Sequence, residues 1–73
     1  MKKKIIEVAS EVFQVPVTEE TTQNDCDKWD SLHHLNLIVA LEEIFDVSFE
    51  PEEIAVMKSI RDIEKALESK QNS

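Results

Sequence analysis

None of the 73 residues of this chain is glycine. Glycine is the residue that most readily adopts positive φ, and tight hairpin turns and phosphate-binding loops usually depend on it. The chain therefore cannot carry a glycine-rich nucleotide loop, and a sheet built from short hairpins is disfavoured. We expect helices joined by ordinary loops.

The length and composition indicate a single globular domain spanning residues 1–73. Apolar residues make up 41% of the chain and charged residues 33%, which is typical of a folded protein. No apolar run is long enough for a membrane span, and residues 1–13 lack the apolar core of a signal peptide. The lone cysteine, Cys26, can form no internal disulfide, so we expect a reducing, cytoplasmic location.

Acidic residues dominate the charge of the chain. Sixteen acids against eight bases give a net charge of −8, and the stretch from Glu7 to Met57 holds 13 acids and one base, Lys28. Such a surface disfavours nucleic-acid backbones and attracts positively charged protein surfaces. We expect no nucleic-acid partner and a monomeric protein that meets partners with basic patches.

Hydrophobic periodicity predicts an all-α fold, a small four-helix bundle with three longer helices and a short third one. The expected helices cover about residues 2–14, 31–45, 51–57 and 60–69, and a long polar loop at 15–29 separates the first two. Pro51 suits the first turn of the third helix. Ser59 and Asp62 have capping-box spacing at the start of the fourth.

The second predicted helix is too apolar to bury all of its apolar residues on one face. On a helical wheel the expected core face contains Leu37, Ile38, Leu41, Ile44 and Phe45. A second apolar stripe lies nearly opposite and contains Leu32, Leu35 and Val39, with the polar neighbours Asn36, Glu42 and Glu43. This stripe either docks on a partner or packs under the long loop.

Metal sites fit the sequence poorly, and we expect none. Asp25 and Asp27 could begin a calcium loop, but Asp30 and Asn36 stand where that loop needs glycine and glutamate. His33 and His34 are helix neighbours and diverge by about 100°, whereas chelation from one helix needs residues three or four apart. A solvated or locally hydrogen-bonded histidine pair is the better interpretation.

Catalysis is also disfavoured. Ser31 has no glycine around it to form a nucleophile elbow, and so small a bundle leaves little room for a pocket of enzyme size. An exposed serine at the start of a helix is instead well placed to be modified by another enzyme. We expect a non-catalytic protein that is an enzyme's substrate.

Four segments, taken with their spacing, carry a family likeness. They are Asp30-Ser31-Leu32 at the start of an apolar helix, Ala40-Leu41-Glu42-Glu43-Ile44-Phe45, Pro51-Glu52-Glu53-Ile54, and a final helix with Ile60 and Ile63. Together they resemble the acyl carrier protein family. The resemblance covers nearly the whole chain and is strongest from Trp29 to Leu67; an isolated Asp-Ser-Leu tripeptide would mean little.

The resemblance implies that Ser31, flanked by Asp30 and Leu32, carries 4′-phosphopantetheine. In the family a phosphopantetheinyl transferase moves this group from coenzyme A with the help of Mg²⁺, and its thiol then holds acyl groups as thioesters. Acyl-loading and acyl-transfer enzymes are the implied partners, in fatty acid, polyketide or related lipid biosynthesis. Family members also often shelter the acyl chain near the serine, which makes Phe49 and Ile54 candidate pocket residues, although ordinary core is the preferred interpretation of both.

The implied docking surface is the second stripe with its polar rim. Its members are Leu32, Leu35, Asn36, Val39, Glu42 and Glu43. The chain departs from the family at Trp29, where glycine is common, and at His33, His34 and Asn36, where acids are common. The departures favour a specialised pathway over general fatty acid synthesis.

Two alternatives stay open at this point. The first is an aminoacyl, peptidyl or D-alanyl carrier of the same fold, which uses the same serine and arm. The second is an unmodified acidic helical adaptor in which Ser31 only caps a helix. Modification of Ser31 separates the adaptor from the carriers.

Overall fold

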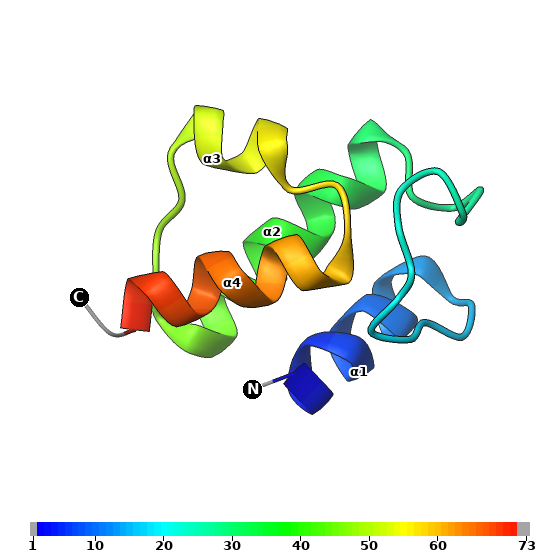
Figure 1. The fold of residues 1–73 in the computed structure, drawn as a ribbon, viewed down its shortest axis with the longest axis horizontal. Coiled ribbons are helices and arrows are strands. Elements are labelled where there is room, and N and C mark those ends of the chain that lie inside the picture. Colours follow the sequence, from blue (N-terminus) through cyan, green and yellow to red (C-terminus); the bar gives the residue numbers. More distant parts are fainter. Residues whose placement is uncertain (1, 72–73) are drawn as a thin grey trace.

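A computed structural model describes residues 2–71 of the chain (Figure 1). It contains four helices, α1 (Lys2–Phe13), α2 (Ser31–Phe45), α3 (Pro51–Val56) and α4 (Ile60–Gln71). Over residues 2–71 there is no strand, and an isolated β-bridge joins Thr22 to Ser59. The predicted all-α, four-helix fold is confirmed. No helix in this range is both long and apolar enough to cross a membrane.

The core is formed mainly by the three longer helices. Its most deeply buried large side chains are Ile5, Phe13, Leu37, Ile38, Leu41, Ile60, Ile63 and Leu67. Helix α1 packs against both α2 and α4. Within each of these helices the buried residues recur at the three-to-four residue spacing that brings side chains onto one helix face. No polar or charged residue between 2 and 71 is buried, so the core stabilises the fold chiefly by apolar burial.

Helix α2 buries less of its predicted core face than expected. Leu37, Ile38 and Leu41 are fully buried and Phe45 is partly buried. The prediction is wrong for Ile44, which is 47% exposed. Ile44 lies at the edge of the expected core face and in the last turn of α2. A side chain there is buried only if a neighbouring element extends past the end of the helix and covers it.

Two helix ends need positive φ, and without glycine other residues supply it. Gln14, which follows α1, has φ of 59°, and Asp46, the C-cap of α2, has φ of 55°. The Gln14 amide donates to the Ser10 carbonyl at 2.8 Å, and the Asp46 amide donates to the Glu42 carbonyl. Left-handed residues of this kind satisfy the last carbonyl groups of a helix.

The short helix α3 is well capped but shallowly placed. The Glu50 amide donates to the Glu53 side chain at 2.8 Å in a reciprocal capping box, and Pro51 occupies the first turn. None of the six residues of α3 is buried. Met57 is the extended C-cap rather than a helical residue, and it is buried, so α3 is held largely from its ends.

The loop between α1 and α2 is tied to the connection between α3 and α4. The Gln23 amide donates to the Lys58 carbonyl at 2.8 Å, and the Ile60 amide donates to the Thr21 carbonyl at 3.1 Å. Val17, near the start of the loop, is buried in the core. These contacts give the long polar segment a defined path to the start of α2.

The start of α2 is remote from both ends of the described chain. In Figure 1, α2 begins at the upper right, whereas α1 begins and α4 ends towards the lower left. Ser31 is therefore displayed at the far side of the bundle from the first and last helical residues.

Candidate functional site

Ser31 is the first residue of α2, and its side chain is exposed. Its hydroxyl makes no hydrogen bond with any residue between 2 and 71. The first amides of a helix lack partners within the helix and carry the positive end of the helix dipole, so an anionic group on this oxygen would be favoured. Ser31 thus offers an accessible oxygen in a setting suited to a phosphate.

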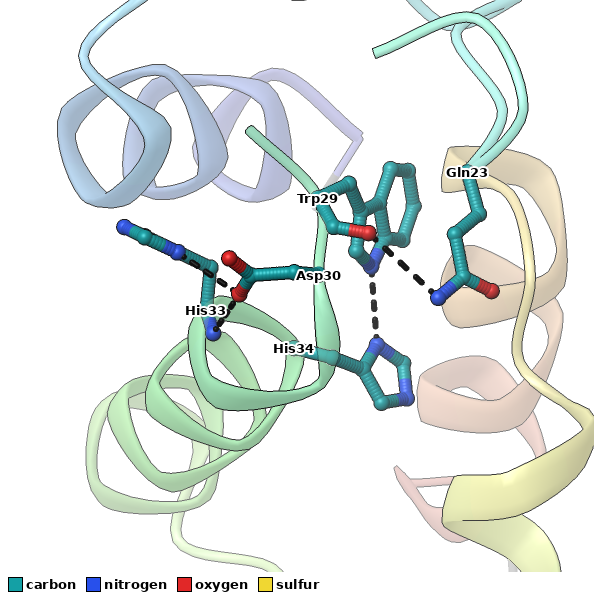
Figure 2. Close-up of polar contacts among 5 residues, drawn as sticks. All are labelled: Gln23, Trp29, Asp30, His33 and His34. Carbon is teal, nitrogen blue, oxygen red and sulfur yellow. Dashed lines mark hydrogen bonds and ion pairs between the residues drawn. The ribbon is translucent and has the colours of Figure 1, made fainter. Parts of the chain in front are cut away.

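Asp30 is the N-cap of α2. Its Oδ1 accepts a hydrogen bond from the His33 amide at 2.9 Å and lies 2.8 Å from His33 Nδ1 (Figure 2). The hydrogen bond from the His33 amide, supported by the one from its ring, holds the pKa of Asp30 below its usual value. The carboxylate is therefore charged beside Ser31 at neutral pH, and it fixes the geometry of the first turn.

Trp29, two residues before Ser31, is 2% exposed and is part of the core. Its ring packs on Phe13 with the ring centroids 5.1 Å apart, and the Gln23 side chain donates to its carbonyl at 3.4 Å. The indole Nε1–H donates to His34 Nδ1 at 2.9 Å (Figure 2). Trp29 therefore anchors the end of the loop at the point where α2 begins.

His34 joins three segments of the chain. Because Nδ1 accepts from the indole, the ring proton lies on Nε2, which donates to the Ile54 carbonyl in α3 at 2.9 Å. The ring also stacks on Trp29 with centroids 6.0 Å apart. The prediction of a solvated or locally bonded histidine pair holds for His33, but it is wrong for His34, because α3 folds back to within hydrogen-bonding distance of that ring.

A shallow groove of about 310 Å³ begins at Ser31 and runs between α2 and α3. Ser31, His34 and Leu35 share one face of α2, since residues three and four apart lie on the same side of a helix. The residues that line the groove are Gln23, Ser31, His34, Leu35, Ile54, Ala55 and Met57. The groove is polar around Gln23, Ser31 and His34 and apolar along Leu35, Ile54, Ala55 and Met57.

The two candidate pocket residues lie in different places. Ile54 is partly buried and lines this groove beside Ser31. Phe49 is 8% exposed and belongs to the core, with Lys70 Nζ 5.7 Å from its ring centroid. The structure therefore brings Ile54, but not Phe49, to the serine.

The predicted docking stripe is exposed. Leu32, Leu35 and Val39 are 65%, 51% and 52% exposed, which excludes the interpretation that they pack under the long loop. Asn36 and Glu43 are also exposed. Glu42 is half-buried, and its Oε2 accepts from the Phe49 amide at 2.8 Å, so it also holds the connection between α2 and α3.

Sequence reasoning missed the contacts of Trp29, His34 and Gln23. Trp29 and His34 occupy the positions before the N-cap and four residues into the helix, where an apolar pair commonly forms a hydrophobic staple. That spacing could have identified the pair. No group of three potential metal ligands is present within residues 2–71.

Comparisons with known proteins place this geometry in a family. No protein-family model matches the chain, and no curated protein matches it. Nine solved chains match, among them the solution NMR structure of a holo acyl carrier protein from Geobacter metallireducens, at 32% identity and a TM-score of 0.85. The match covers 97% of this chain and 85% of that one, and it supports a carrier role. The chain belongs to the acyl carrier protein family.

Proposed function

We propose that Ser31 carries 4′-phosphopantetheine, donated by coenzyme A, and that the chain holds acyl intermediates on that arm as thioesters. The observation that supports this most directly is the exposed Ser31 hydroxyl at the start of α2, within the Asp30-Ser31-Leu32 motif. The similarity to a holo acyl carrier protein supports the same prosthetic group.

The residues around Ser31 fit such a group. The positive end of the α2 dipole favours a phosphodiester on the serine oxygen. Asp30 and Leu32 flank that oxygen and are exposed, so a phosphopantetheinyl transferase would contact both. When bound, the group supplies a terminal thiol that forms thioesters, while the residues of α2 hold its point of attachment.

Partner enzymes dock, on this proposal, on the exposed stripe of α2. Leu32, Leu35 and Val39 form its apolar centre, and Asn36 and Glu43, together with the half-buried Glu42, form its rim. Enzymes with basic patches are attracted to such a rim, and the resulting contacts weaken as salt is added. A tethered acyl group then acts at high local concentration on whichever enzyme has docked.

We place the carrier in a specialised branch of fatty acid, polyketide or related lipid biosynthesis. His33, His34 and Asn36 give the first turns of α2 no acidic side chain, and two of these residues are engaged in hydrogen bonds. Enzymes that recognise acids there would dock poorly. Loading and elongation by general fatty acid synthase enzymes should be slow, and equal efficiency with their own carrier would exclude this assignment.

Intact-protein mass spectrometry tests the attachment. The chain is incubated with coenzyme A, Mg²⁺ and a broad-specificity phosphopantetheinyl transferase, alongside Ser31→Ala and the matched variant Ser48→Ala, which alters another exposed serine. We expect one phosphopantetheine on the wild type and on Ser48→Ala, and none on Ser31→Ala. No gain with several transferases would contradict the proposal and favour an unmodified adaptor.

A further inference from the structure

Helix α3 is attached to the rest of the molecule by few contacts. The buried residues Phe49 and Met57 anchor its two ends, and Glu53 forms a 2.8 Å ion pair with Lys70 on the α4 side. Within residues 2–71, the side-chain hydrogen bond that joins α2 to α3 runs from His34 Nε2 to the Ile54 carbonyl. Elements with little buried surface open at low free-energy cost.

The His34 ring is held in one orientation from its other side. Trp29 donates to Nδ1 and stacks on the ring, and Trp29 is itself buried against Phe13. A neutral ring with its proton on Nε2 satisfies both hydrogen bonds at once. The indole, which belongs to the core, thereby sets the direction in which His34 reaches α3.

This connection crosses the groove that begins at Ser31. Ser31, His34 and Leu35 face α3 across the groove, and Ile54 and Ala55 form the opposite wall. Figure 2 shows His34 directed away from the axis of α2, on the side opposite to His33. Any group tethered to Ser31 that lies in the groove must therefore share it with the His34 ring.

We infer that His34 is a positioning residue that holds α3 close to the Ser31 face of α2 and so limits the size of the acyl group that can lie in the groove. The limit on the acyl group rests on the proposed attachment at Ser31. The positioning of α3 does not, because its hydrogen bonds exist without the arm. Two experiments test the positioning of α3 and the limit on acyl size separately.

The first experiment measures amide hydrogen exchange in the unmodified protein. His34→Phe keeps the ring and the stacking but removes both hydrogen bonds. We expect exchange of the Ile54 and Met57 amides to rise about fivefold, while α1 and α4 are unchanged. Met57 is a direct reporter, since its amide donates to the same Ile54 carbonyl that His34 contacts.

Two variants control for simple loss of stability. His34→Gln supplies one acceptor and one donor, as the neutral ring does, and should restore slow exchange in α3. His33→Phe changes the neighbouring ring, which bonds to Asp30, and should leave α3 unaffected. Unchanged exchange in His34→Phe, or an equal rise in all four helices, would overturn the positioning role.

The second experiment uses the protein loaded at Ser31 with butanoyl, octanoyl or dodecanoyl phosphopantetheine. Cleavage of each thioester by hydroxylamine is timed in the wild type, His34→Ala and His34→Gln. We expect His34→Ala to slow cleavage of the two longer thioesters about threefold, because apolar chains would then be buried, and to leave the butanoyl thioester unchanged. His34→Gln should behave as the wild type.

The outcomes of the second experiment are distinct. The same chain-length dependence in the wild type and in His34→Ala would overturn the size limit. Failure of Ser31 to accept the arm would overturn the proposed function and the size limit with it. In that case the exchange measurement would still decide whether His34 positions α3.

Discussion

Helices α3 and α4 follow one another in the chain, yet they are held in opposite ways. Helix α4 buries Ile60, Ile63 and Leu67 completely, whereas α3 buries none of its six residues. Helix α4 is thus part of the core, whereas α3 is attached through its two ends, the partly buried Ile54 and a few polar contacts. The groove at Ser31 lies against the weaker of the two, where a change in shape costs least.

Truncation of one isoleucine in each helix should show the difference between α3 and α4 most clearly. Ile63→Ala removes a fully buried side chain, and we expect it to lower the free energy of unfolding by roughly 2–5 kcal/mol. Ile54→Ala removes a partly buried one and should cost less than half as much. Chemical denaturation measures both, and equal losses would show that α3 contributes to the core as α4 does.

Replacement of the indole should loosen α3 selectively. Trp29→Phe keeps an aromatic ring against Phe13 but removes the donor to His34. The expected loss of stability is about 1 kcal/mol, with faster hydrogen exchange in α3 than in α4. If the two helices responded equally, the indole would be acting only through the core.

Acid should open α3 before α4. The hydrogen bond from Lys70 holds the pKa of Glu53 below its usual value of 4.5, so this carboxylate stabilises the fold above that pH. Its contribution is lost as pH falls below 4.5 and through the lower pKa of the folded state. Hydrogen exchange across this range should show α3 opening first, and Glu53→Gln should remove that step. Simultaneous opening of all helices would argue against it.

Salt should have the smallest effect. The chain carries a net charge of −8, and the acids Glu50, Glu52 and Glu53 at the start of α3 repel one another. Added salt screens this repulsion. We expect Tm to rise slightly in a sodium chloride series. A fall would mean that screening of ion pairs such as Lys2–Glu19, at 2.6 Å, outweighs the relief of repulsion.

The regular elements could be predicted because their periodicity is local. The apolar stripe of α4, with Ile60, Ile63 and Leu67, is visible in the sequence and is buried as expected. Ile44 was misplaced because a helical wheel gives the direction of a side chain, and it does not show whether a neighbouring element reaches far enough to cover it.

The site could be predicted only in part. The position of Ser31 at a helix start follows from local capping signals and the family resemblance. The contact of His34 with Ile54 joins residues 20 apart in sequence, and it depends on how α3 folds back over α2. No local pattern specifies how α3 folds back over α2, although the spacing of Trp29 and His34 could have indicated their pairing at the helix start.

The separation between the start of α2 and the two chain ends has a practical consequence. Because α1 begins and α4 ends on the side of the bundle away from Ser31, either end could be linked to a bead, a fluorophore or a second protein without covering the serine (Figure 1). If Ser31 accepts the proposed phosphopantetheine, the fold is therefore suited to use as a tag that a transferase labels while the chain is attached to another protein or a surface.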